Sequence, residues 1–147
     1  MAERDTELQT AIKRAEDMHG HLGPFLVIGV RMGKAAMRSL NLTAEESGRL
    51  QVVVKVPLRT PFSCVLDGIQ TTTKCTVGNQ KLKMRNQEKG IGAEFSVQGS
   101  GKTVRVQVNP ETIESMMTKM AEGTVPEEAA REIEEAPESQ LFTVDRR

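Results

Sequence analysis

The 147-residue chain has no tryptophan and no tyrosine, so four phenylalanines are its only aromatic side chains. Proteins that bind single-stranded nucleic acid stack the bases on aromatic rings. The chain also lacks an excess of charge, because 20 basic residues balance 20 acidic ones and leave no overall field to attract a polyanion. We therefore expect a core of aliphatic residues and methionine, and no nucleic-acid partner.

Cysteine and long apolar runs are equally scarce. Two cysteines are too few for a disulfide framework, and no apolar stretch reaches the length of about 18 residues that spans a bilayer. The beginning of the chain, MAERDTELQT, resembles neither a signal peptide nor a transit peptide. These absences favour a cytoplasmic protein with no membrane partner, and the length fits one domain.

Apolar spacing and turn residues predict an α+β fold. Helices are expected over 5–19, 24–40, 64–73, from Pro110 onward and over 124–135, and strands over 50–56, 80–86, 91–97 and 103–108. The second helix is apolar on most sides and is therefore predicted to be central. Gly29 and Gly33 leave one side of it open to close approach. Met116, Met117 and Met120 form a stripe that we assign to the core.

Charge is distributed unevenly along the chain. Residues 51–110 carry nine basic and three acidic side chains, whereas residues 111–147 carry four and ten. We expect the α+β domain to comprise residues 1–123 and residues 124–147 to form a peripheral acidic helix or tail, which either lies near the basic middle or is solvated by its own charge. The basic run of Lys81, Lys83, Arg85 and Lys89 is typical of a solvated strand face.

Only four side chains are good ligands for a soft metal, namely His19, His21, Cys64 and Cys75. Their spacing is not that of a zinc finger. His19 and His21 can share an ion only if the chain leaves the helix near Gly20, because residues two apart on a helix point in nearly opposite directions.

The two cysteines form the second cluster of candidate ligands, and helix geometry again limits which side chains can share an ion. Cys64 and Asp67 share a helix face, but Cys75 lies roughly 16 Å further along if the helix is continuous. We interpret His21 and Cys64 as metal ligands, with His19 and Asp67 in or next to the coordination sphere and Cys75 at a separate end of the site or facing a partner subunit. The alternatives are a structural histidine, buried cysteines that act as small apolar residues, and a solvent-facing Asp67.

Two motifs resemble those of the FmdE family, which takes its name from formylmethanofuran dehydrogenase. The first is His19-Gly20-His21-Leu22-Gly23-Pro24 followed by Gly29-Val30-Arg31-Met32-Gly33, and the second is Cys64-Val65-Leu66-Asp67-Gly68-Ile69-Gln70 followed by Cys75-Thr76-Val77-Gly78-Asn79. The resemblance implies a core of α-β-α-β-β-β with a mixed four-stranded sheet packed on helices, similar to the C-terminal half of glyceraldehyde-3-phosphate dehydrogenase. It also implies a homodimer that binds a transition metal, commonly zinc, and an association with a molybdenum or tungsten formylmethanofuran dehydrogenase of one-carbon metabolism and methanogenesis.

The chain departs from the family pattern at one position that matters for the metal. Gly23 stands where the family has a cysteine, and Phe25 replaces the glycine that follows. Loss of a thiolate removes a strong ligand. Three functions therefore stay open: a metal-binding accessory protein, a metal-free module for a small ligand or a protein partner, and a small enzyme in which Cys64 is the nucleophile and His21 the base.

Overall fold

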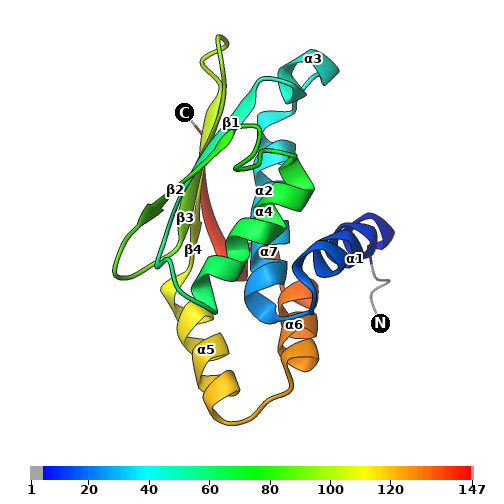
Figure 1. Ribbon diagram of the computed structural model, residues 1–147, viewed down its shortest axis with the longest axis vertical. Helices are drawn as coiled ribbons and strands as arrows, with labels where there is room; N and C mark the ends of the chain where they lie inside the picture. The colour runs from blue at the N-terminus through cyan, green and yellow to red at the C-terminus, as the bar shows by residue number, and fades with distance from the viewer. Residues whose placement is uncertain (1–4, 147) are drawn as a thin grey trace.

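A mixed five-stranded sheet forms one layer of the computed structural model, which describes residues 5–146 (Figure 1). The strand order is β2-β1-β3-β4-β5, where β1 pairs with β2 in parallel and all other neighbours are antiparallel. The strands span Leu50–Val56 (β1), Leu82–Asn86 (β2), Gly92–Val97 (β3), Thr103–Val108 (β4) and Phe142–Arg146 (β5). Successive side chains of a strand point to opposite faces, and in β1, β3 and β4 the side chains of one face are buried, while those of the other are mainly exposed.

The buried face of the sheet is covered by helices, and the central one is α2. The helices span Thr6–His19 (α1), Pro24–Leu40 (α2), Ala44–Ser47 (α3), Val65–Thr73 (α4, preceded by the 3-10 turn Phe62–Cys64), Pro110–Ala121 (α5), Pro126–Glu135 (α6) and Glu138–Leu141 (α7). Helix α2 contacts α1, α4, α6 and strand β4. Twelve of its residues are buried, as its apolar composition predicts. None of the described helices is both long and apolar enough to cross a bilayer.

The α+β class and the mixed sheet on helices are confirmed, but the sheet has five strands and not the four that we expected. The fifth strand comes from the acidic C-terminal segment, which does not lie at the periphery. Its strand β5 pairs with β4, with Phe142 opposite Val108. On α6, Ile133 is only 2% exposed, since Ala129, Ala130 and Ile133 form a narrow apolar stripe among the glutamates.

Arg31 of the Gly-Val-Arg-Met-Gly motif fastens α6 to α2. Its guanidinium donates hydrogen bonds to the carbonyl oxygens of Ile133 at 2.9 Å and Glu134 at 3.4 Å, and also to that of Ala136. The last carbonyls of a helix have no partner within the helix, so this side chain serves as their cap. Desolvation lowers the pKa of Arg31 from its usual value, although the negative charge of Glu138 partly raises it again.

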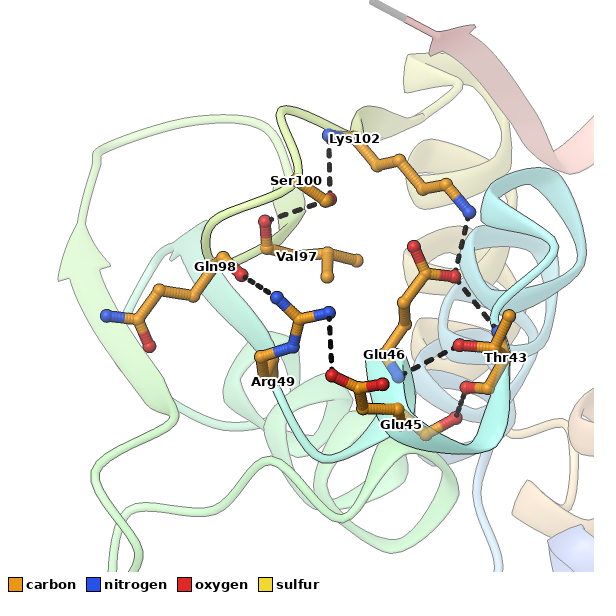
Figure 2. A network of polar contacts seen from close by, with 9 residues as sticks. Thr43, Glu45, Glu46, Arg49, Val97, Gln98, Ser100 and Lys102 are labelled. Atoms are coloured by element: carbon orange, nitrogen blue, oxygen red, sulfur yellow. Dashed lines mark hydrogen bonds and ion pairs between the residues drawn. The ribbon is translucent and has the colours of Figure 1, made fainter.

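A polar network ties the β3–β4 turn to α3 (Figure 2). Thr43 and Glu46 form a reciprocal capping box at the start of α3. The Glu46 carboxylate also accepts a hydrogen bond of 2.8 Å from Lys102, which lowers the pKa of that carboxyl. On the other side of the network, Arg49 donates to the carbonyl oxygen of Gln98 at 2.9 Å. The turn at 98–102 is thereby held against the helical layer.

The burial of α6 predicts a large effect of Ile133→Ala. Removing this side chain leaves a cavity against α2, and we expect the free energy of unfolding, measured by urea denaturation, to fall by about 2–5 kcal/mol. Arg131→Ala on the exposed side of the same helix is the matched control and should stay within about 0.5 kcal/mol of the parent. Equal, small effects of both substitutions would show that residues 124–147 are dispensable for the core.

Candidate histidine–carboxylate site

Two glycines allow α2 and α4 to touch backbone to backbone. A Cβ atom built on Gly29 would lie 2.2 Å from the carbonyl oxygen of Val65, and one built on Gly68 would lie 2.3 Å from that of Leu26. Real Cβ atoms do not approach backbone so closely, so neither position accepts a larger residue without a shift of the helices. Gly33 also faces α4, where a Cβ would lie 3.0 Å from Thr72. The close approach expected beside Gly29 and Gly33 is therefore confirmed.

This contact brings the start of α4 to the end of α1. His19 is the last residue of α1, and Gly20, with a φ of 104°, ends the helix in a left-handed conformation. The Nδ1 atom of His19 lies 2.5 Å from Oδ2 of Asp67 on α4. The other oxygen of Asp67 accepts a hydrogen bond of 3.3 Å from Gln70. The carboxylate therefore holds the imidazole ring, whose second nitrogen faces in another direction.

That second nitrogen is unusual. Nε2 of His19 is buried and has no hydrogen-bond partner in the part of the chain that the structure describes. Buried polar atoms are nearly always paired, so this ring nitrogen, one of three such side-chain atoms among the described residues, needs a partner such as a ligand or a water molecule. A neutral imidazole whose Nδ1 is bonded to a carboxylate has its Nε2 lone pair free, which is the arrangement of many metal-binding histidines.

His21 lies beside His19 after the turn at Gly20. The two ring centroids are 4.7 Å apart and the rings meet edge to face, at 75°. A Cβ built on Gly23 would lie 3.7 Å from Cε1 of His21. Gly23, the position at which the family resemblance implies a cysteine, thus adjoins the second imidazole and carries no side chain.

Cys64 lies directly before the first residue of α4, one turn ahead of Asp67. Its thiol is half-buried, and desolvation together with the charge of Asp67 raises the pKa of that thiol. Phe62, at the preceding 3-10 turn, packs edge to face on Phe25 with ring centroids 5.5 Å apart. The approach of Cys64 to His21 within about 5 Å, which a shared zinc requires, stays a prediction.

Cys75 lies away from the two histidines. It follows the C-cap of α4 and is only 1% exposed. Its Sγ donates a hydrogen bond of 3.2 Å to the carbonyl oxygen of Leu50 at the start of β1. Burial raises the pKa of this thiol. The structure therefore places Cys75 among buried apolar groups, at the end of α4 opposite to Asp67.

The residues present fit a metal ion in part. His19 offers a buried, unpartnered nitrogen and His21 a second ring beside it, while Asp67 is engaged in holding His19. Across residues 5–146, no three side chains of His, Cys, Asp or Glu are placed to hold one ion. Protein zinc sites have three or four protein ligands. The described residues thus supply two of these, and any further ligand comes from a side chain that moves or from outside the chain.

A large cleft begins at Phe62, and no sequence pattern predicted it. It has a volume of about 800 Å³ and separates α5 from the loops after β1 and after β2. Its apolar lining includes Phe62, Ile91, Ile113 and Met117. Met116 is buried as expected, but Met117 and Met120 of the same stripe are only half-buried. Helical spacing identifies an apolar stripe but does not reveal whether a helix or a cleft faces it.

The chain is an α+β protein in which a central apolar helix covers one face of the sheet. A histidine–carboxylate pair lies where three of its helices meet. The family model described as FmdE, molybdenum formylmethanofuran dehydrogenase operon, matches residues 18–144. The chain therefore belongs to the FmdE family, as its two motifs predicted.

The proteins similar to the chain include a curated relative and a solved structure. A probable S-adenosyl-L-methionine-binding protein of Archaeoglobus fulgidus is 32% identical over 121 residues, which make up 82% of this chain. The chain spans about a third of that relative, 32% of its length. A tungsten formylmethanofuran dehydrogenase FmdE-like protein from Syntrophus aciditrophicus has the same fold, with a TM-score of 0.67 and 19% identity over 99% of this chain and 76% of the other.

The close helix contact predicts that Gly68→Ala is strongly destabilising. The added methyl group meets backbone of α2, which cannot rotate away, and we expect the free energy of unfolding to fall by about 3 kcal/mol. Gly48→Ala is the control, because its Cβ would lie 3.5 Å from the nearest atom, at ordinary contact distance. Thermal denaturation measures both. A Gly68→Ala variant as stable as the parent would mean that the two helices do not touch as described.

Proposed function

We propose that the protein is a metal-binding accessory protein of the formylmethanofuran dehydrogenase type, with zinc as the metal. The single observation that carries this proposal is the buried, unpartnered Nε2 of His19 on a ring whose Nδ1 is held by Asp67. Membership of the FmdE family, whose description names a molybdenum formylmethanofuran dehydrogenase operon, supports the association with one-carbon metabolism.

Each residue of the site has a distinct task in this proposal. His19 and His21 are the imidazole ligands, and Asp67 orients the ring of His19. Cys64 is a further ligand, which must lose its proton to bind, because a metal binds the thiolate. Its raised pKa opposes that loss in the metal-free protein. A bound zinc ion would act there as a Lewis acid.

Gly23 carries no side chain beside His21, so a metal ion held by His21 would have no protein ligand from this position. Catalytic and ligand-exchanging metal sites keep such a position open, whereas structural sites close it. We propose accordingly that the metal site of this protein accepts an external ligand. We place its action in the cytoplasm, as a homodimer and in association with a molybdenum or tungsten formylmethanofuran dehydrogenase.

Metal analysis tests the proposal directly. In protein purified without an affinity tag we expect close to one zinc per chain. His19→Gln should abolish this content, and Asp67→Asn should weaken zinc affinity by about 10- to 100-fold, because the asparagine no longer provides a carboxylate for the ring. Protein that holds no metal, even after anaerobic reconstitution with zinc, would contradict the proposal.

The two cysteines provide a matched pair of controls. Cys64→Ala should lower the zinc content much more than Cys75→Ala, since Cys75 is buried beyond the far end of α4 and bonded to Leu50. Equal losses in the two variants would show that Cys75 also binds the metal, from a rearranged α4 or from a second copy of the chain.

A second candidate function, binding of a small organic ligand without metal, is favoured by the cleft of about 800 Å³. Ligand pockets commonly have volumes of roughly 300–1,000 Å³, and the lining of this cleft combines a few apolar side chains with many charged and polar ones. The name of the Archaeoglobus fulgidus relative suggests S-adenosylmethionine as the first ligand to test. A nucleophilic role for Cys64 is not favoured, because its raised pKa is the opposite of what a reactive thiolate needs.

Calorimetric titration with S-adenosylmethionine distinguishes the two candidates. If the cleft binds this ligand, the metal-free protein should bind it, and Met117→Glu should weaken the affinity by about tenfold or more, because the substitution removes one of the few apolar side chains that line the cleft. Met120→Glu, on the same helix but not among the residues that line the cleft, is the control. If the metal-free protein does not bind S-adenosylmethionine, the cleft is ruled out as the site for this ligand.

A further inference from the structure

The open face of the sheet carries a pair of like charges that the fold does not explain. Lys55 of β1 is the register partner of Arg85 of the parallel neighbour β2, and both side chains are exposed. Neighbouring strands are only about 4.8 Å apart, and like charges directly opposite each other destabilise a sheet. Within the described residues neither Lys55 nor Arg85 takes part in an ion pair.

Protection of the sheet edge accounts for only one of the two charges. Strand β2 is at the edge of the sheet, where charged residues prevent pairing with another chain. Lys83 and Arg85 of β2 suit that task. Lys55 does not, because β1 lies inside the sheet between β2 and β3. Lys55 is therefore a second positive charge next to Arg85, and protection of the sheet edge does not explain it.

A hollow adjoins the two cations because the next residue across the sheet has no side chain. Gly92 of β3 is the register partner of Lys55 on one side and of Gln107 of β4 on the other. A Cβ built on Gly92 would lie 3.3 Å from Oε1 and 3.5 Å from Nε2 of Gln107. The side-chain amide of Gln107 thus stands over the glycine at the border of the hollow, where its NH₂ group is an available donor.

The hollow has a volume of about 410 Å³ and is bordered on its other sides by Gln87, Arg105 and Val53. Gln87 is fixed by a hydrogen bond of 2.9 Å from its side chain to the carbonyl oxygen of Gly90. Arg105 is paired with Glu94 at 3.1 Å, which neutralises it in part. The unbalanced charge at the hollow is therefore that of Lys55 and Arg85.

The geometry points to a binding site for a small phosphate-bearing ligand on the open face of the sheet, with Lys55, Arg85 and Gln107 as its contacts. An anion between the two cations turns their repulsion into two charge-assisted hydrogen bonds. A phosphate group occupies only a part of the volume, and the half-buried side chain of Val53 offers an apolar surface to the organic part of the ligand. The site lies on the face opposite to the helices and is independent of the histidine site.

Titration of the full-length protein with inorganic phosphate, followed through backbone amide shifts in the NMR spectrum, tests the site. We expect saturable shifts confined to β1–β4 near Gly92, and a weaker affinity as the salt concentration rises. Lys55→Gln and Arg85→Gln should each weaken binding by about tenfold. Lys83→Gln is the matched control, on the same strand as Arg85 but outside the lining of the hollow, and should have a much smaller effect.

The Gly92→Ala variant tests the contribution of the hollow to phosphate binding separately from that of the two positive charges. Its φ lies outside the left-handed region, and the new methyl group meets only the flexible end of Gln107, so the fold tolerates it. It narrows the hollow beside Lys55 without altering any charge and should weaken phosphate binding as well. Succinate in place of phosphate distinguishes a phosphate ligand from a dicarboxylate: tighter binding of succinate would overturn the phosphate assignment.

Three results would overturn the site itself. The first is the absence of saturable shifts, and the second is shifts that persist unchanged in both Lys55→Gln and Gly92→Ala. The third is a change in sedimentation of the Lys55→Gln variant with unchanged phosphate binding, which would make this face an interface between copies of the chain.

Discussion

The contact of backbone against backbone between α2 and α4 is the constraint on which the rest of the structure depends. Gly29 and Gly68 are the residues that permit it, because a Cβ at either position would overlap a carbonyl of the other helix. Asp67 immediately precedes the second of these glycines and so reaches His19, 48 positions earlier in the chain. The same contact seals α4 onto the helix that covers the sheet. One pair of small residues thus determines both the packing of the layer and the geometry of the site.

The fold could be predicted from the sequence as far as local patterns extend. The helices that begin at Thr6, Pro24 and Pro110 have capping residues or prolines at their first turn, and the first four strands alternate or are rich in valine. Strand β5 could not be predicted in this way. It is five residues long, with only Phe142 and Val144 as apolar positions, and it is stabilised by its pairing with β4, which no local pattern encodes. The acidic surface of α6 likewise hides a stripe of only three buried residues.

The motifs identify the residues of the candidate site but not their arrangement. They single out His19, His21, Cys64 and Asp67, and the structure brings His19, His21 and Asp67 together. Spacing along the chain favours His21 and Cys64 as the leading pair, whereas the best-defined contact is between His19 and Asp67. The direction of each ring depends on the left-handed turn at Gly20 and on the separation of two helices, and these are tertiary quantities. The cleft beside α5 and the hollow at Gly92 arise in the same way, from surfaces that meet only in the folded chain.

The one-sided covering of the sheet also has an evolutionary consequence. In β1, residues at even positions from Leu50 to Val56 are buried, and the three between them face outward. Two sets of residues with different selective constraints are therefore interleaved in the same seven positions. The inward set belongs to the core and can change only together with the residues packed there, whereas the outward set is not held by that packing. Proteins that share this fold can thus acquire different ligands on the open face while the histidine site and the core remain as they are.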